Sequence, residues 1–240
     1  MVKITRLIIL RKCLGLKIKQ NFMKWMFICL NFFALSFISC AQKQKNDNEK
    51  LPKTMISLKT NESVATFANG CFWCTEAIFQ NLKGVIKVTS GYSGGHVANP
   101  SYEEVCDKQT GHAEALEIIY DSTKISFDEL LEVFWKTHDP TTLNQQGADI
   151  GPQYRSVVFY HNEEQKAKAK QYKKALDEAK IYDAAIVTAV EPFSNFYAAE
   201  NYHQNYYNNN KNSNGYCRIV ITPKVEKFKK VFKDKLKKED

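Results

Sequence analysis

The sequence predicts an α/β (α+β) fold: a two-layer sandwich in which helices pack on a mixed sheet, with a ferredoxin-like core and long irregular loops. Segments with the apolar pattern of strands are intermixed along the chain with segments of helical apolar spacing, an order typical of helices packed on a sheet. The chain has 240 residues, 44% of them hydrophobic and 12% aromatic, which is enough to bury a large core. Three long segments lack a regular pattern, residues 90–113, 138–152 and 192–218, and we expect the functional site to be built there.

The first three predicted elements form a strand, a helix and a strand. Residues 63–68 (SVATFA) have the pattern of a strand. Residues 74–82 (CTEAIFQNL) show the apolar spacing of a helix, and Gly84 ends it. Residues 85–89 (VIKVT) predict a second strand.

Local signals bound the next two elements. Residues 114–120 (EALEIIY) predict a third strand, and the turn that ends it begins at Asp121. A helix then begins at Ser126, because Glu129 stands at the capping-box position three residues later. Pro140 follows the last turn of that helix and ends it.

The last four elements alternate again. A strand is expected at 153–160 (QYRSVVFY), and a helix rich in Ala, Lys, Glu and Gln at 162–180. Residues 185–191 (AIVTAVE) predict another strand, and residues 225–236 predict an amphipathic basic helix. We interpret the lysines of this helix as a solvated face.

Residues 1–40 have the pattern of a targeting leader. A basic region begins at Met23, and the apolar run at 25–38 is shorter than the roughly 20 residues that a membrane span needs. The small residue and cysteine that follow resemble a bacterial lipoprotein signal, in which Cys40 would be lipidated and become the new N-terminus, although Phe37 stands where an aliphatic residue is usual. The leader therefore predicts export and a membrane anchor on the periplasmic side of the bacterial cell envelope.

Two boundaries follow from this leader. The signal is complete without residues 1–22, which leaves open whether these residues are translated. Residues 41–60 are polar and lysine-rich and are expected to form a flexible tether. The folded domain is then expected at 61–240.

The net charge of +8 does not indicate a nucleic-acid partner. Seven basic residues and no acidic ones lie in residues 1–40, and without them the excess of basic over acidic residues falls from 8 to 1. A nucleic-acid-binding domain needs a basic face in its folded part. We therefore expect a near-neutral domain that binds no nucleic acid.

The stretch NGCFWCTE at 69–76 carries the strongest chemical signal. Gly70 allows a sharp turn, and Cys71 then lies at the first turn of the predicted helix. Free N–H groups and the helix dipole at that position favour the thiolate, which is the nucleophilic form.

Three chemistries fit these two cysteines. Cys71 and Cys74 have the spacing of a thioredoxin-like redox pair. Together with His96 or His112 they could bind zinc, although a second tight ligand pair is absent from the sequence. In the third interpretation one thiol attacks a small electrophile while the two aromatic residues between the cysteines form a pocket for its apolar end.

Four ordered blocks resemble the peptide methionine sulfoxide reductases of type A, the MsrA family. They are GCFW at 70–73, GYSGGHVANPSYEEVCDKQTGHAEALEIIYD at 91–121, FWKTHDPTTLNQQGADIGPQYRS at 134–156 and AENYHQNY at 199–206. The resemblance covers roughly residues 63–222 and implies a catalytic domain at 61–240 that reduces methionine S-sulfoxide, free and in proteins. It also implies a monomer that uses thioredoxin or a similar dithiol and needs neither metal nor organic cofactor.

The resemblance assigns roles to the following residues. Cys71 would attack the sulfoxide sulfur, and Glu114 would donate the proton from an apolar pocket that raises its pKa. The remaining matches are Tyr102 and Tyr154 as donors to the sulfoxide oxygen, Phe72 and Trp73 as a clamp for the methyl group, and Asp149 and His203 as residues that contact the substrate backbone. Cys71 would end as a sulfenic acid that a second thiol closes into a disulfide.

The resolving thiol remains open between two cysteines. Cys217 follows an Asn-Ser-Asn-Gly stretch expected to be a flexible loop, and it matches the C-terminal resolving cysteine of many relatives. Cys74 replaces a glycine found in many relatives, and its disulfide with Cys71 would be strained on an intact helix. Cys106 is expected to be a buried free thiol.

Two other functions were compatible with the sequence. A disulfide oxidoreductase would use the cysteine pair alone, and an inactive module would bind oxidised methionine without turnover. The joint presence of Cys71, Glu114 and two candidate resolving thiols favours the reductase.

Overall fold

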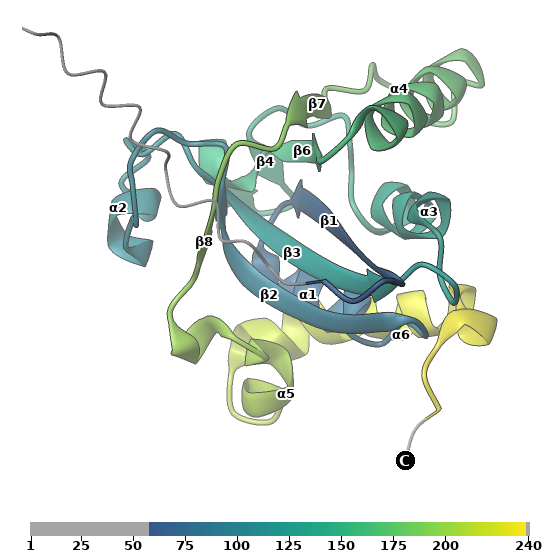
Figure 1. The fold of residues 1–240 in the computed structure, drawn as a ribbon. Coiled ribbons are helices and arrows are strands. Elements are labelled where there is room, and N and C mark those ends of the chain that lie inside the picture. Colours follow the sequence, from purple (N-terminus) through teal and green to yellow (C-terminus); the bar gives the residue numbers. More distant parts are fainter. Residues whose placement is uncertain (1–57, 239–240) are drawn as a thin grey trace, which may run out of the picture. The chain divides into compact units, whose positions relative to one another are not determined.

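The computed structural model describes residues 58–238 (Figure 1). The leader with Cys40, and the tether up to residue 57, lie outside the described residues, so these two assignments stay predictions. No helix within residues 58–238 has the length and apolar character needed to cross a membrane.

A six-stranded mixed sheet forms the centre of the domain. Its strand order is β7-β6-β1-β3-β2-β8, and every neighbouring pair is antiparallel except β6 and β7. The strands are β1 (Glu62–Asn69), β2 (Val85–Ser93), β3 (Ala113–Asp121), β6 (Ser156–Tyr160), β7 (Ala189–Pro192) and β8 (Phe196–Ala198), with a separate small pair formed by β4 (Gln145–Gln146) and β5 (Asp149–Ile150).

The four central strands and two helices have the connectivity of a ferredoxin-like core. The two helices of this core are α1 (Phe72–Phe79) and α3 (Phe127–Thr137). The other α-helices are α2 (Tyr102–Cys106), α4 (Glu163–Glu178), α5 (Tyr206–Asn210) and α6 (Thr222–Val231). The order β1-α1-β2-β3-α3-β6 is the split βαβ pattern, with β1 and β3 in the middle of the sheet. The predicted fold class is confirmed.

Helices α1 and α3 cover the same face of the sheet. The ring of Phe67 on β1 lies 5.7 Å from Phe79 of α1 and 5.1 Å from Phe134 of α3, measured between ring centroids. All three rings are fully buried, so this face holds the main core, and Figure 1 shows α1 behind the curved strands. Burying three such rings contributes several kcal/mol to stability.

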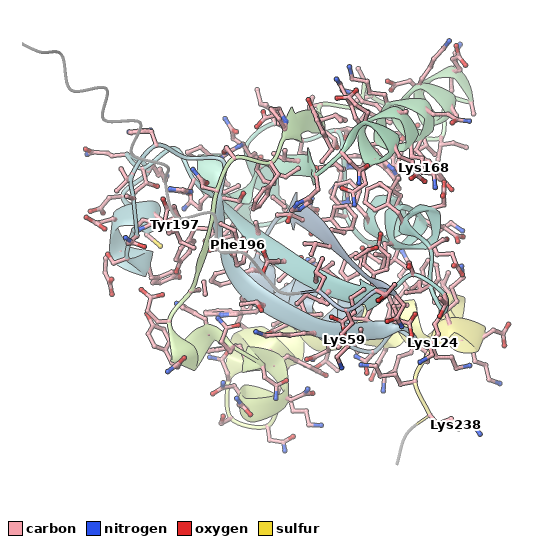
Figure 2. All side chains as sticks on the ribbon, viewed as in Figure 1. Lys59, Lys124, Lys168, Phe196, Tyr197 and Lys238 are labelled. Atoms are coloured by element: carbon pink, nitrogen blue, oxygen red, sulfur yellow. The ribbon has the colours of Figure 1, made fainter. Side chains whose placement is uncertain are left out.

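A smaller apolar layer covers the opposite face of the sheet. Ala68 of β1 and Phe159 of β6 belong to it, and Phe196 packs against it from β8. Figure 2 labels Phe196 and Tyr197 where β8 lies beside the end of β2. Gly91 permits this close approach, since a Cβ there would lie 2.4 Å from both the Phe196 ring and the Tyr197 carbonyl.

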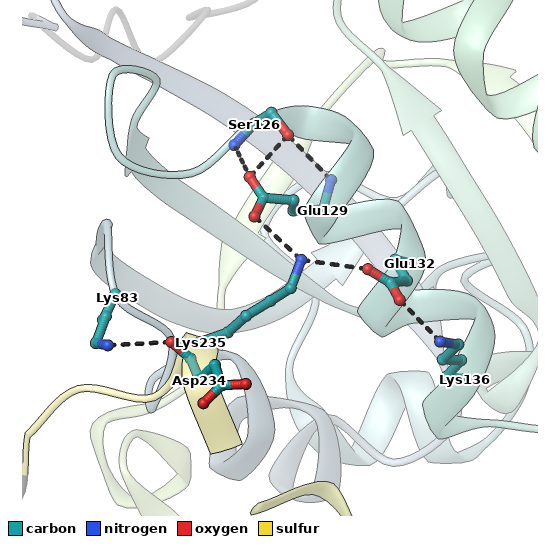
Figure 3. A network of polar contacts seen from close by, with 7 residues as sticks. All are labelled: Lys83, Ser126, Glu129, Glu132, Lys136, Asp234 and Lys235. Atoms are coloured by element: carbon teal, nitrogen blue, oxygen red, sulfur yellow. Dashed lines mark hydrogen bonds and ion pairs between the residues drawn. The ribbon is translucent and has the colours of Figure 1, made fainter. Parts of the chain in front are cut away.

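Ion pairs and hydrogen bonds fix the C-terminal segment to the rest of the domain (Figure 3). Lys235, in the 3-10 turn η4 (Lys233–Lys235), reaches Glu129 at 3.0 Å and Glu132 at 3.2 Å, both on α3. The side chain of Lys83 donates to the carbonyl of Asp234 at 3.0 Å. Helix α6 is thus held at its C-terminal end against both α3 and the turn after α1.

Several boundaries differ from the predicted ones. Helix α1 begins at Phe72 rather than at residue 74, which makes Cys71 its N-cap. Strand β6 begins only at Ser156, because Pro152 starts a 3-10 turn, η1 (Pro152–Tyr154). Strand β7 is shorter than expected and begins at Ala189.

The segments expected to be irregular contain some regular structure. Helix α2 begins with a capping box in which Ser101 and Glu104 bond each other's backbone N–H groups. Cys106 ends this helix half-buried, so the expectation of a buried thiol is wrong. The chain beyond Asn214 is helical rather than a loop, starting with the π-helical turn η3 (Cys217–Ile221) and continuing as α6.

Candidate active site

A sharp corner between β1 and α1 places the nucleophile candidate. Gly70 has a φ of +92°, and a Cβ on it would lie 2.5 Å from Cγ of Gln146, so glycine is required there. Cys71 follows as N-cap, and its carbonyl accepts hydrogen bonds from the N–H groups of Cys74 and Thr75. The sharp turn predicted at Gly70 is therefore present, and it aims Cys71 into the domain.

Glu114 lies beside this corner on β3. Its Oε2 accepts a hydrogen bond of 2.9 Å from the N–H of Phe72, the residue after Cys71. The carboxyl group is 2% exposed, and burial raises its pKa to about 8. A carboxyl group with this pKa keeps its proton near neutral pH, and the role of Glu114 as proton donor stays a prediction.

Five aromatic rings are packed together at the site next to Glu114. Phe72 is buried, and its ring centroid lies 5.0 Å from that of His203. Trp73 is half-buried, stacks on Tyr206 at 3.8 Å, and donates from Nε1 to Nδ1 of His203 at 3.0 Å. His203, on the turn η2 (Asn201–His203), also contacts the ring of Tyr102 at 4.5 Å.

His203 is held as a neutral imidazole. Its Nδ1 accepts the bond from Trp73, so the ring proton belongs on Nε2, which is buried and 3.8 Å from Glu200. Burial lowers the pKa of His203. Glu200 itself accepts hydrogen bonds from the Tyr92 hydroxyl and the Tyr102 N–H, both at 2.9 Å, which ties η2 to β2 and α2.

Two phenols, Tyr102 and Tyr154, lie within the electrostatic reach of Glu114. Tyr102 is the first residue of α2, and Tyr154 the last residue of η1. Burial raises the pKa of both, and the negative charge of Glu114 adds to the effect. Both therefore stay protonated and able to donate over the whole working pH range.

Cys74 lies in a polar corner between α1 and the C-terminal helix. The ammonium of Lys224 donates to its Sγ at 3.8 Å, and the hydroxyl of Tyr216 lies 3.9 Å away. That hydroxyl also donates to Oδ2 of Asp149 at 2.8 Å. Asp149 thus lies at this corner, on β5, rather than isolated on the surface.

The thiol groups of Cys71 and Cys74 lie within hydrogen-bonding reach of each other, and each changes the pKa of the other. Burial raises the pKa of Cys71, which outweighs the helix N-terminus that was expected to favour its thiolate. The hydrogen bond from Cys71 lowers the pKa of Cys74, burial opposes this, and the charge of Lys224 supports it. Of the two thiols, Cys74 is therefore the one that ionises more readily.

Cys217 belongs to the same apolar cluster as these two cysteines, which we call the thiol cluster: Cys71, Cys74, Ala77, Cys217, Ile221 and Val225. It is fully buried in the π-helical turn, so the expected flexible position is wrong. The side chain of Asn214 accepts hydrogen bonds from the N–H groups of Tyr216 and Cys217, which fixes the start of this turn. Burial raises the pKa of Cys217. The π-helical turn would therefore have to unfold before the Cys217 thiol could move over a longer distance.

One buried carboxyl group was missed in the sequence. Glu76 of α1 is 3% exposed, and its two oxygens accept hydrogen bonds from the N–H groups of Asn205 and Tyr206. Burial raises its pKa. It anchors α5, and with it Tyr206, against Trp73. The signal was present in CTEAIF, where one acidic residue interrupts an apolar helical run.

The structure thus brings the predicted site residues to one region around the start of α1. They come from α1 and its N-cap, α2, β3, β5, η1, η2 and η3, and the long segments between the main elements supply Tyr102, Asp149, Tyr154, His203 and Cys217. Tyr216 and Lys224 also reach the site, and neither was singled out in the sequence. Among residues 58–238 no three His, Cys, Asp or Glu side chains are grouped so as to hold a metal ion.

The chain is similar in sequence to proteins of one family. Residues 63–236 match the family described as peptide methionine sulfoxide reductase. The peptide methionine sulfoxide reductase MsrA 1 of Rhodopirellula baltica is 56% identical over 182 residues, which cover 76% of this chain and 93% of the relative. The MsrA of Saccharolobus solfataricus is 54% identical over 72% of this chain and 97% of its own length.

Solved structures with the same fold agree with these sequence matches. Mxr1 from Saccharomyces cerevisiae in reduced form aligns with a TM-score of 0.61 and 34% identity, over 65% of this chain and 89% of that one. Methionine sulfoxide reductase A of Corynebacterium diphtheriae aligns with a TM-score of 0.57 and 31% identity, over 63% and 76% of the two chains.

Proposed function

We propose a residue-level mechanism for this chain, which belongs to the type A family of peptide methionine sulfoxide reductases and is itself such a reductase. The observation that carries the mechanism is the buried Glu114, bonded to the N–H of Phe72 and therefore fixed next to Cys71. A protonated carboxyl beside a thiol is what oxygen transfer from a sulfoxide to sulfur requires, because the leaving oxygen must gain a proton.

In the first half-reaction the Cys71 thiolate attacks the sulfoxide sulfur. The thiolate forms when Cys71 passes its proton to Cys74 along their hydrogen bond. Glu114 then gives its proton to the oxygen, methionine is released and Cys71 becomes a sulfenic acid. The hydroxyl groups of Tyr102 and Tyr154 donate to the oxygen while negative charge develops on it.

The aromatic residues bind the rest of the substrate. Phe72 and Trp73 present an apolar surface to the methyl group, and His203 fixes the indole through its hydrogen bond. Asp149, half-buried on β5, and the buried His203 line the site as the residues proposed to contact the substrate backbone. We expect this arrangement to select the S epimer of methionine sulfoxide, in peptides and as the free amino acid.

In the second half-reaction a second thiol closes a disulfide with Cys71. We propose that Cys74 resolves first, since it already contacts Cys71, and that Cys217 follows as a relay because it packs in the same thiol cluster. Thioredoxin or a similar dithiol then reduces the final disulfide. The reaction consumes no metal or organic cofactor, and all the proposed site residues come from one chain, which supports a monomer.

The location of the enzyme rests on its leader. The apolar run at 25–38 followed by Ser39 and Cys40 supports export and lipidation of Cys40, with the domain held on a tether at the periplasmic face of the cell envelope. Mass spectrometry of the mature N-terminus tests this: a diacylglyceryl group on Cys40 is expected, and an N-terminus upstream of Cys40 would contradict it.

The catalytic assignment is tested by reduction of peptide methionine S-sulfoxide with dithiothreitol. We expect turnover with the wild type, none with Cys71→Ser, and unchanged turnover with Cys106→Ser as the matched cysteine control. Turnover that persists in Cys71→Ser would refute the assignment of the nucleophile. Reduction of insulin disulfides without sulfoxide turnover would instead favour a disulfide oxidoreductase.

A further inference from the structure

Lys224 is a cation without a carboxylate partner at the thiol cluster. Its side chain is half-buried on α6, and within residues 58–238 no carboxylate forms an ion pair with it. The acidic group that its ammonium contacts is the Cys74 sulfur, at 3.8 Å. A half-buried ammonium that is placed on a thiol favours the thiolate, because the opposite charges attract in a poorly solvated site.

Tyr216 does not supply the same stabilisation. A phenol carries one O–H proton, and that of Tyr216 is donated to Asp149 at 2.8 Å. The phenol oxygen, 3.9 Å from the Cys74 sulfur, therefore presents lone pairs and no proton to that sulfur. The ammonium of Lys224 is therefore the cationic donor to this thiol.

We propose that Lys224 is a positioning residue for the resolving step, which holds Cys74 as the thiolate that attacks the Cys71 sulfenic acid. This inference rests on the proposed reductase mechanism and assigns one part of it to a residue on the C-terminal helix. In the step the Cys74 sulfur forms a bond to the Cys71 sulfur as the sulfur–oxygen bond breaks. Cys74, which took up the Cys71 proton in the first half-reaction, gives up that proton to become the thiolate. The hydroxide that leaves the Cys71 sulfur takes up one proton and departs as water, so overall one disulfide and one water replace a sulfenic acid and a thiol.

The surroundings of Cys74 make the charge of Lys224 necessary for this step. The other ionisable groups that act on Cys74 or respond to its charge are Cys71, Glu114, Asp149, Tyr216 and Cys217. Each of these is neutral or negative, so none of them replaces the cation. Lys224 also acts on His138, but burial lowers the pKa of that imidazole to about 4, so it is neutral at pH 7.

The test measures the two half-reactions separately in the purified full chain, in a Cys217→Ser background that leaves Cys74 as the resolving thiol. One equivalent of peptide methionine S-sulfoxide is added without reductant, and released methionine is measured by chromatography. Samples are quenched with N-ethylmaleimide at intervals, and the Cys71–Cys74 disulfide is measured by peptide mass spectrometry from pH 5.5 to 9.5. Lys224→Met removes the charge, Lys224→Arg retains it, and Lys227→Met removes an exposed charge from the same helix.

We expect Lys224→Met to release methionine and yet close the disulfide about tenfold more slowly at pH 7, with the pH midpoint of closure raised by about one unit. Lys224→Arg should restore most of the rate, and Lys227→Met should match the background protein. Release of methionine shows that each variant is folded and that the proposed function holds. If Lys224→Met releases methionine and closes the disulfide with an unchanged rate and midpoint, the role of Lys224 is refuted.

Discussion

Replacement of Glu114 by glutamine separates the catalytic role of this residue from its effect on stability. Burial raises the pKa of Glu114 from its ordinary value of 4.5 to about 8, and a tenfold change in a proton-binding constant corresponds to about 1.4 kcal/mol. Below its unfolded pKa this carboxyl group is protonated in both the native and the unfolded state, so its full contribution to stability is present. As the pH rises towards the folded pKa, the unfolded state loses its proton while the native state keeps it, and that contribution is lost. The native state of the wild type therefore loses up to about 5 kcal/mol relative to a non-ionising residue between pH 4.5 and pH 8.

Glutamine is the matched substitution, because it keeps the shape and its side-chain oxygen can still accept the hydrogen bond from Phe72. We expect Glu114→Gln and the wild type to be about equally stable at pH 4.5. Above that pH the variant should gain about 1.4 kcal/mol per pH unit over the wild type, up to a plateau above pH 8. Its sulfoxide reduction should fall by roughly 10²- to 10⁴-fold, since an amide does not act as the acid.

The assay is guanidinium unfolding followed by tryptophan fluorescence at each pH from 4.5 to 9, together with single-turnover methionine release. All other titrating groups are common to both proteins, so the difference in unfolding free energy isolates Glu114. A difference that stays constant from pH 4.5 to 9 would refute a raised pKa and, with it, the reason for choosing Glu114 as the acid. In the wild type, methionine release should also decline above pH 8.

Four further substitutions test other parts of the structure. Tyr102→Phe and Tyr154→Phe should each lower the single-turnover rate roughly tenfold or more with little change in thermal midpoint, because each removes one donor to the oxygen; unchanged rates would show that neither phenol bonds it. Gly70→Ala should lower the stability by about 2 kcal/mol or more in a thermal scan, since φ is +92° and the new Cβ would lie 2.5 Å from Cγ of Gln146; an unchanged midpoint would contradict this. Lys235→Ala should cost about 1 kcal/mol in low salt and less in high salt, as its ion pairs with Glu129 and Glu132 are partly exposed; salt-independent loss would point to packing instead.

Local sequence signals predict an element boundary correctly where the interacting residues lie within one helical turn of each other. Ser126 and Glu129 form the predicted capping box, with 3.2 Å between the Glu129 N–H and the serine hydroxyl. The same signal is present at Ser101 and Glu104 and was missed, because the helix that it begins has only five residues. Strand β6 was predicted to begin too early because Gln153 and its neighbours were read as extended, although Pro152 starts a 3-10 turn.

The site was predictable residue by residue only through the resemblance to a family. Periodicity placed Cys71 at a helix start, but it did not show that burial would raise the pKa of this thiol. The position of Cys217 depends on how α6 packs against α1, which is a tertiary contact without a local signal. For the same reason the sequence gives no signal for Lys224, which precedes the helix predicted at 225–236 and whose side chain reaches the Cys74 sulfur.

The charges of the site explain why the proposed acid and the proposed nucleophile share one buried corner. Cys71 and Glu114 disfavour each other's ionisation, so the state with a thiolate at Cys71 is also the state in which Glu114 keeps its proton. In the proposed mechanism, attack moves the negative charge from the Cys71 sulfur to the Glu114 carboxylate, because the thiolate becomes a neutral sulfenic acid as the carboxyl loses its proton. The pocket therefore holds one negative charge before and after the step, and neither state requires a second charge to be buried there. Since the Phe72 N–H binds the carboxylate, the backbone that positions the nucleophile also stabilises the charge that its attack leaves behind.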